Sequence, residues 1–190
     1  MLTDRIVGAF TFRREVYAEV ERDTSFTSTA WLLVVVVSFL NQLGGHASRN
    51  LLSWILGAIV GTVFVVIGFA LGALVISWVG KAVFNAEVTF DELVRTLGLA
   101  YVWNVVGFIG IVAGIIPALG CLLAPVLIIA GLMGLVAWLV AAKEALDLEW
   151  VQVIITVVIG WVVLLVINLI AGAVIGLMGL AAAGVGGLFG

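Results

Sequence analysis

Charged side chains are scarce in this chain of 190 residues, and that scarcity is the strongest indication of its class. Asp, Glu, Lys and Arg together make up 10% of the residues, hydrophobic residues make up 65%, and the mean hydropathy is +1.38. Soluble domains carry about 25% charged residues. From Thr96 to Gly190 the charges are confined to the short island 143–149. These uncharged stretches exclude a soluble globular protein and predict a chain that crosses a membrane several times.

Residue types that serve catalysis and metal binding are scarce as well. The chain has one cysteine, Cys121, and one histidine, His46. A single cysteine cannot form an intramolecular disulfide, and a lone histidine lacks the further ligands that a metal or haem requires. We find no Gly-rich phosphate loop, no nucleophile elbow and no basic nucleic-acid patch. We therefore expect no enzymatic activity, cofactor, metal or nucleic-acid partner. We expect Cys121 to be a buried apolar residue and His46 a solvated loop residue, and a small-molecule ligand stays an open question.

The uncharged runs predict an all-α, polytopic integral membrane helical bundle with five transmembrane helices, over residues 28–172. The predicted spans cover about 29–43, 51–80, 96–116, 121–142 and 150–172. Each is bounded by turn residues or charges, among them Gly44-Gly45, the turn from Pro117 to Gly120 and the island 143–149.

The last residues, 173–190, form an apolar Gly/Ala-rich tail. This tail either extends the fifth helix, lies on the membrane surface or forms a sixth, short span. A helix from Trp150 to the end would be about 60 Å long, which no single crossing of a bilayer needs.

Residues 1–27 predict an amphipathic helix and its cap ahead of the first span. One side of a helix over 1–23 carries Leu2, Ile6, Phe10, Val16, Tyr17 and Val20. The charges of this helix prevent it from spanning a membrane, and its apolar side is too broad for a helix that is free in solution. The mixed charge gives little attraction to anionic lipid, so we favour docking at least partly on protein, either this chain or a partner. A helix lying in the lipid headgroup region is the alternative.

The distribution of Lys and Arg predicts the orientation. With five spans, the segments on the side of the N-terminus hold Arg5, Arg13, Arg14, Arg22, Lys81, Arg95 and Lys143, and the opposite side holds only Arg49. Lys and Arg collect in cytoplasmic loops. We therefore expect a cytosolic N-terminus and a C-terminus on the outer side of a membrane, which we expect to be a prokaryotic cytoplasmic membrane.

Four stretches carry a family resemblance: EVYAEVERD (15–23), FNAEVTFDELVRTLGLA (84–100), VAGIIPAL (112–119) and AAKEALDLEWVQVIITVVIGW (141–161). In their order and spacing the chain resembles the Yip family of Rab/Ypt-interacting multi-pass membrane proteins, in particular its prokaryotic branch. The resemblance implies a five-span bundle with a cytosolic N-terminus. The eukaryotic Asp-Leu-Tyr-Gly-Pro motif is replaced here by DTSFTST, so Rab binding is not implied.

Glycines at helical spacing predict close helix packing. Gly57, Gly61, Gly68 and Gly72 fall on one side of the second predicted span, and Gly110 and Gly114 repeat the spacing in the third. Such GxxxG pairs let another helix approach closely. We expect packing within the bundle, with a homodimer seam as the alternative. Inside the third and fifth spans, Asn104 and Asn168 are expected to be buried polar residues that hydrogen-bond between helices.

We expect a partner-facing surface on the cytosolic side, formed by Phe10, Tyr17, Arg95, Lys143 and Asp147. The nearby carboxylates of Glu87, Asp91, Glu92, Glu144 and Glu149 are expected to be solvated loop charges, some of them paired with Arg95 and Lys143. These features favour a non-catalytic scaffold or accessory subunit that contacts the lipid bilayer and other membrane proteins or a second copy. The alternative is a small-solute channel or transporter with a neutral, glycine-lined path.

Overall fold

Helices joined by short connections make up the part of the chain that the structure describes. The structure, a computed structural model, describes residues 1–45, 47, 50–163 and 165–166. The helices are α1 (Leu2–Phe10), α2 (Arg14–Arg22), α3 (Phe26–Gly45), α4 (Leu51–Phe84), α5 (Phe90–Ala100), the 3-10 helix η1 (Tyr101–Ile109), α6 (Gly110–Ile115), α7 (Pro117–Leu146) and a last helix Trp150–Val163. Over these residues the chain has no strand, so the fold is all-helical.

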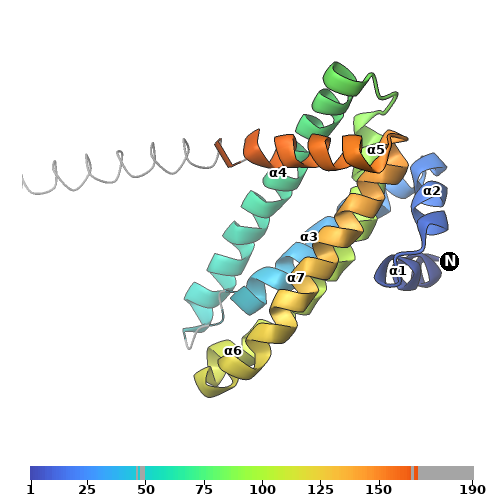
Figure 1. Cartoon of the computed structure of the whole chain (residues 1–190). Helices are drawn as coiled ribbons and strands as arrows, with labels where there is room; N and C mark the ends of the chain where they lie inside the picture. The colour runs from blue at the N-terminus through green and yellow to red at the C-terminus, as the bar shows by residue number, and fades with distance from the viewer. Residues whose placement is uncertain (46, 48–49, 164, 167–190) are drawn as a thin grey trace, which may run out of the picture.

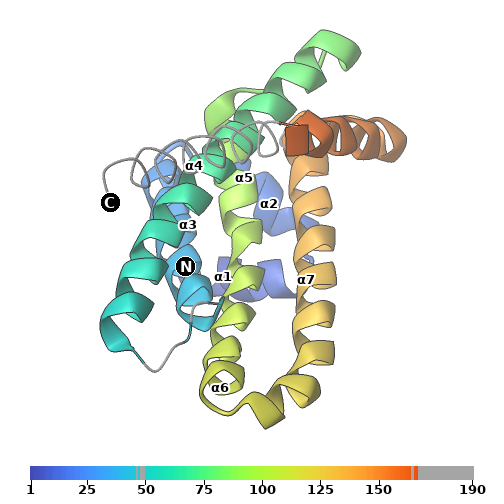
Figure 2. The same ribbon diagram turned by 90° about the vertical axis from the view of Figure 1, so that its left-hand side faces the viewer.

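The long helices run side by side as a bundle (Figures 1 and 2). α3 packs against α4, α5 and η1, and α7 packs against α5, η1 and α6. Four stretches are long and apolar enough to cross a membrane, namely α3, α4, α7 and the run Phe90–Ile115. The charged segments 81–95 and 143–149 lie at one end, which we call the charged end (Figure 2). The α3–α4 connection and the α6–α7 turn lie at the opposite end, which we call the far end.

α4 is the longest helix that the structure describes, and an asparagine marks each of its ends. Asn50 caps its start by accepting a hydrogen bond from the Ser53 N–H (3.1 Å), and Asn85 ends it in a left-handed conformation with φ of 54°. Asparagine tolerates this conformation better than most residues. As a helix of 34 residues α4 measures about 51 Å, longer than the roughly 30 Å hydrocarbon core. Part of α4 therefore projects beyond a bilayer or the helix tilts within it.

The third apolar segment is not the single α-helix expected over 96–116. It starts at α5, where Thr89 and Glu92 form a reciprocal capping box, and continues as η1 and then α6. A 3-10 run of nine residues is unusually long. Its sequence YVWNVVGFI has β-branched and aromatic residues with modest α-helical propensity. The tightened backbone also packs closely against α3, where it carries Gly107 against Gly44.

The hairpin between α6 and α7 is tighter than the sequence predicted. The predicted turn reached Gly120, but α7 already begins at Pro117, and Ile116 alone connects the two helices. Proline suits the first turn of a helix because its missing N–H is not needed there. α7 then continues through Pro125 to Leu146. Its buried side chains all belong to the charged end, between Ala137 and Leu146.

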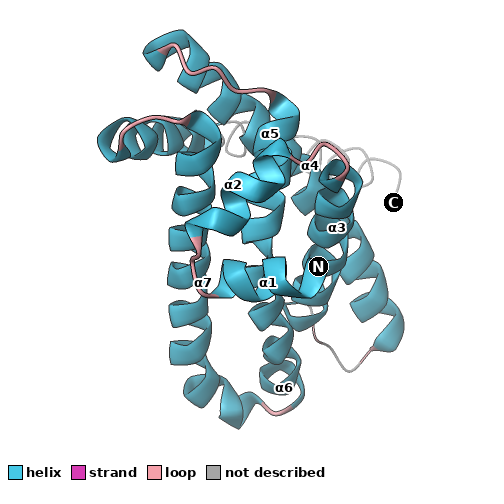
Figure 3. Cartoon of the chain, turned by 90° about the vertical axis from the view of Figure 1, so that its right-hand side faces the viewer, coloured by secondary structure: helices cyan, strands magenta, loops and turns pink. Residues whose placement is uncertain are grey.

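The N-terminal segment forms two helices and not one helix over 1–23. The break falls at Phe12, which has a positive φ of 56° although it is neither glycine nor asparagine. Figure 3 shows α1 and α2 lying across the bundle at different angles. The break lets Ala9 on α1 and Tyr17 and Val20 on α2 all become buried against the bundle. The break changes the direction of the chain, and both helices pack against the bundle.

The helix Trp150–Val163 runs across the bundle and not along it (Figures 1 and 2). It packs against the charged-end half of α4, where Gly160 lies against Ile76 and Thr156 lies near Gly80. It has 14 residues and is shorter than the four helical stretches above. The predicted fifth span 150–172 and the tail 173–190 extend outside the described residues, so a count of five spans stays a prediction.

Candidate functional site

The N-terminal hairpin α1–α2 lies against the side of the bundle, with α2 toward the charged end and α1 nearer the middle (Figure 3). α2 packs against α5 and α7, and α1 contacts α5 and η1 (Figure 3). The covered side chains belong to one continuous apolar core, which includes Val16, Tyr17, Leu93, Leu97 and Ala141. The N-terminal segment therefore docks on this chain's own helices α5, η1 and α7.

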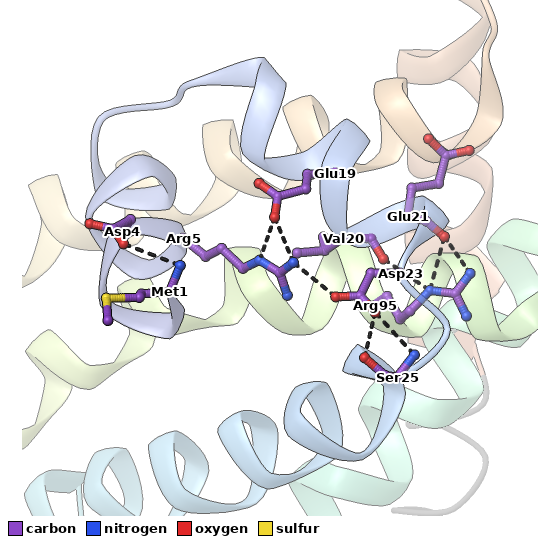
Figure 4. A network of polar contacts seen from close by, with 9 residues as sticks. All are labelled: Met1, Asp4, Arg5, Glu19, Val20, Glu21, Asp23, Ser25 and Arg95. Atoms are coloured by element: carbon purple, nitrogen blue, oxygen red, sulfur yellow. Dashed lines mark hydrogen bonds and ion pairs between the residues drawn. The ribbon is translucent and has the colours of Figure 1, made fainter.

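Arg95 is the polar centre of this contact, and it is 4% exposed. Its Nε lies 3.0 Å from the carbonyl oxygens of Val20 and of Glu21, and Nη2 also donates to Glu21 (Figure 4). Its Nη1 donates to the Thr27 hydroxyl at 3.2 Å. The guanidinium of α5 thus satisfies the last-turn carbonyls of α2, where a cation is also favoured by the helix dipole. Arg95 was expected to face a partner and to pair with a carboxylate. Both expectations are wrong, because the end of α2 covers its side chain.

A second arginine ties α1 to the end of α2 and the start of α3. Arg5 donates from Nη2 to Glu19 (2.6 Å) and to Asp23 (2.8 Å), and its guanidinium lies 4.9 Å from the centre of the Phe26 ring (Figure 4). Hydrogen bonds from the Ser25 hydroxyl and from Arg5 lower the pKa of the Asp23 carboxyl. Because these pairs are partly solvated, we assign them to positioning the hairpin and not to a large part of its stability.

Trp103 of η1 holds the end of α1. Its indole Nε1 donates to the Ala9 carbonyl at 3.3 Å, while Phe12 stacks on its ring at 5.4 Å and Phe10 meets the ring edge-on at 5.0 Å. The Tyr17 hydroxyl donates to the same carbonyl at 3.4 Å. Such aromatic pairs are worth about 0.5–1.5 kcal/mol each beyond area burial. The stacking also accounts for the strained backbone of Phe12.

Tyr17 is fully buried, so the expectation that it faces a partner is wrong. The sequence showed its apolar side but could not show which surface covers it. Burial raises the pKa of its phenol, which stays protonated at neutral pH. Phe10 is half-buried because Trp103 covers one side of its ring.

The remaining predicted partner-facing residues lie at the end of α7. Lys143 is half-buried, and Asp147 is exposed in a left-handed conformation with φ of 49°. Glu144 pairs with Arg14 of α2 at 2.6 Å, whereas the sequence suggested Lys143 or Arg95 as partners for the carboxylates. Among the predicted residues, Asp147 is thus the one left exposed at this end.

Glu21 carries an electrostatic cost in this arrangement. Desolvation raises the pKa of its carboxyl, and the carboxylates of Asp147, Glu92 and Glu144 raise it further, while Arg22 opposes them. Above this raised pKa, the ionised carboxylate of Glu21 lowers the stability of the folded protein. This destabilisation is lost as the pH falls toward the ordinary glutamate pKa of 4.5, because the carboxyl then becomes protonated.

We expect Glu21→Gln to raise the thermal midpoint in detergent at neutral pH, because the substitution removes this penalty. The gain should shrink as the pH is lowered toward the ordinary glutamate pKa, since Glu21 then becomes neutral by itself. Glu15→Gln, on the exposed side of α2, serves as the control. An equal gain from both substitutions would mean that general charge reduction is responsible and not the environment of Glu21.

The predicted packing glycines have different environments. A Cβ at Gly61 would meet the Gln42 side chain of α3, whereas one at Gly68 would have no atom within 4 Å. Gly57 is half-buried and Gly72 is buried. Gly110 lies against the Gly44 backbone, and Gly114 lies against Ala47. The tightest helix crossing that the structure describes thus joins α3 to η1 and α6, and it involves Gly44 and Gly107, which the prediction did not include.

Of the two asparagines predicted to be buried, the structure describes Asn104 and not Asn168. Asn104 is half-buried, and its side-chain Nδ2 donates to the Tyr101 carbonyl at 3.2 Å. The backbone carbonyl of Asn104 accepts a hydrogen bond from Nδ2 of Asn41 at 2.8 Å. Asn41 thus links α3 to η1, and sequence inspection missed it because it lies at the edge of the first predicted span. Asn168 lies outside the described residues.

The described residues hold no group of three His, Cys, Asp or Glu side chains arranged to bind a metal ion. His46 lies outside them. Cys121 is exposed in the first turns of α7, so the expectation that it is buried is wrong. Its position on an outward-facing apolar helix still fits a small residue in contact with lipid.

The helices and their composition define an integral membrane protein built as a helical bundle. A family model described as the Yip1 domain matches residues 7–172, so the chain belongs to the Yip1 domain family. No curated protein and no solved structure matches it. The family resemblance noted in the sequence is thereby confirmed, and the assignment to the prokaryotic branch stays a prediction.

Proposed function

We propose that this Yip1-domain protein is a non-catalytic membrane scaffold or accessory subunit that binds other membrane proteins, or a second copy, through the outer face of α4. The observation that supports this role is the open space at Gly68. On the same helix face, Phe64 is 66% exposed and Leu71 is 39% exposed. Residues three or four apart on a helix are neighbours. Gly68 therefore forms a notch between two large apolar side chains.

A notch of this kind suits a transmembrane helix of a partner. Where a helix exposes glycine, a second helix can approach its backbone and gain van der Waals contact, which is the main attraction between helices in lipid. Of the other glycines on this side, Gly61 faces Gln42 of α3, Gly72 is buried and Gly57 is half-buried. Gly68 thus has open space beside it, and we propose that a partner helix occupies this space.

We expect Gly68→Leu to abolish co-purification of the partner, or to convert a dimer to a monomer, without changing thermal stability. Leucine fits the open space, so the bundle keeps its packing, but the side chain fills the notch. Val63→Leu, on a different exposed side of α4, is the matched control. The measurement is purification in mild detergent followed by mass spectrometry and light scattering. Unchanged association of Gly68→Leu would show that this face binds only lipid.

Asp147 and the half-buried Lys143 give the proposed scaffold a second contact surface at the charged end. We propose that this end is cytosolic, in accord with the uneven distribution of Lys and Arg in the sequence. Single cysteines at Gly45 and Glu149, both exposed, test the orientation in a Cys121→Ala background. An impermeant thiol reagent added to intact cells should label Gly45→Cys and leave Glu149→Cys unlabelled. The reverse pattern would invert the proposed orientation.

A further inference from the structure

A groove follows η1–α6 and α7, which run side by side along the bundle (Figure 2). It consists of three adjoining hollows of about 450, 180 and 250 Å³. The first and second share Asn41, Gly107 and Leu127, and the second and third share Asn104 and Gly131. Hollows of this size between the helices of a bundle, mostly apolar and with a few polar groups, are typical of small-molecule sites.

Two asparagine amides line the second hollow. Nδ2 of Asn41 donates to the Asn104 backbone carbonyl (2.8 Å), and Nδ2 of Asn104 donates to the Tyr101 carbonyl (3.2 Å). Each nitrogen carries a second hydrogen, and among the described residues no hydrogen bond reaches the Oδ1 atom of either side chain. The hydrocarbon of a bilayer provides no water to satisfy these groups. The amides therefore offer both acceptors and donors to a polar group that enters the hollow.

Aromatic rings line the third hollow. The ring centres of Trp138 and Trp161 lie 6.4 Å apart, and Tyr101 lines the same hollow. Phe69 meets the Tyr101 ring edge-on at 5.6 Å and so supports this wall. On the α7 side, a Cβ at Gly131 would have no atom within 4 Å. A flat ring placed here would have aromatic neighbours and free space beside the α7 backbone.

Trp103 forms a fixed wall of the second hollow. Its indole nitrogen donates to the Ala9 carbonyl at 3.3 Å, and Phe12 stacks on its ring at 5.4 Å. The N-terminal hairpin thus holds this side chain in one orientation. A site whose walls are held in place binds with a smaller entropic cost than one that must first order its side chains.

The first hollow extends toward the far end and indicates that the ligand is largely apolar. Its lining consists of glycines, alanines, Asn41 and Leu127. Such walls give van der Waals contact to an alkyl group. A glycerolipid has alkyl chains, but its ester oxygens only accept hydrogen bonds and would leave the Oδ1 atoms of both amides unpaired. A hydroxyl group donates and accepts, so it suits the two amides better than an ester does.

We propose that this groove binds a lipid-soluble molecule that carries a hydroxylated aromatic ring. The ring lies against Trp138 and Trp161 in the third hollow. Its hydroxyl donates to Oδ1 of Asn104 and accepts from the remaining N–H of an amide. An apolar substituent of the ring extends past Leu127 into the first hollow. The lining residues belong to α3, the α3–α4 connection, η1, α6, α7 and the last helix, so the site is separate from the notch on α4 and either proposal can fail alone.

Tryptophan fluorescence of the full-length protein in detergent tests this site. The probes are a brominated hexylphenol and its methyl ether, which has the same ring and chain but no hydroxyl hydrogen. Bromine in contact with Trp138 and Trp161 quenches their emission. We expect saturable quenching by the phenol and roughly 10-fold weaker binding of the ether, because the ether cannot donate to Asn104. Equal affinities for the two probes would overturn the proposal.

Two variants and a control locate the bound ring. Gly131→Leu fills the open space and should abolish the saturable quenching. Asn104→Leu should weaken binding of the phenol to the level of the ether and remove the preference between them. Thr62→Val removes a buried hydroxyl that donates within α4, outside the groove, and should leave both affinities unchanged. Saturable quenching that persists in Gly131→Leu would show that the probe binds elsewhere and would overturn the proposal, even if Asn104→Leu does not fold.

Discussion

Gly44→Ala is expected to destabilise the protein strongly, because the backbones of α3 and η1 meet at this residue. A Cβ at Gly44 would overlap the backbone carbonyl oxygen of Gly107 on η1, and no side-chain rotation can move either atom aside. The two helices would have to separate, which would also loosen the hydrogen bond from Asn41 to the Asn104 carbonyl. Overpacking of this kind costs about 3 kcal/mol at the upper end of its usual range, which lowers a thermal midpoint by roughly 10 °C.

The neighbouring residue supplies the control for this experiment. A Cβ at Gly45 would have no atom within 4 Å, so Gly45→Ala should leave the thermal midpoint unchanged. Both variants are compared in the same detergent at one heating rate, because membrane proteins often unfold irreversibly. Equal midpoints for the two variants would contradict the close crossing of α3 and η1.

Arg95→Met is expected to release the N-terminal hairpin while the bundle itself stays folded. Methionine keeps much of the volume but leaves the carbonyls of Val20 and Glu21 without their donor. Hydrogen bonds to a charged group contribute about 1.5–3 kcal/mol each, so a net loss of about 3 kcal/mol is reasonable for this cluster. Amide hydrogen exchange in α1 and α2 should then become roughly 100-fold faster.

Arg95→Lys separates charge from geometry in this contact. Lysine keeps the positive charge, but a single ammonium cannot reproduce the planar fork that reaches α2 and Thr27 together. We expect intermediate exchange for this variant and unchanged exchange in α7. Slow exchange of α1 and α2 in Arg95→Met would show that apolar burial alone holds the hairpin.

The all-helical membrane fold was predictable because it depends on composition and on the length of uncharged runs. The membrane requires every buried backbone group to be paired, so an apolar run of sufficient length becomes a helix whatever its neighbours are. Helix ends were also visible where a local signal marks them, as at the Thr89–Glu92 capping box. The Yip family was recognisable from the order and spacing of four motifs along the chain.

Features that depend on contacts between distant residues were not predictable. Arg95 was assigned to a partner because nothing near it in sequence shows that α2, about 75 residues earlier, would cover it. The break at Phe12 has no glycine or proline signal and follows from its stacking on Trp103. The glycine prediction had the same limit. Spacing identifies a small face, as at Gly61 and Gly68, but only the fold shows which of the two a neighbouring helix already occupies.

The central claim is that the outer face of α4 binds another membrane protein, and site-specific photocrosslinking in native membranes tests it most directly. A photoreactive amino acid is placed at Phe64, beside the Gly68 notch, and in a second variant at Val63, on a different exposed side of α4. Irradiation should give a discrete protein adduct from Phe64, identifiable by mass spectrometry, and only lipid adducts from Val63. Lipid adducts alone from both positions would contradict the claim.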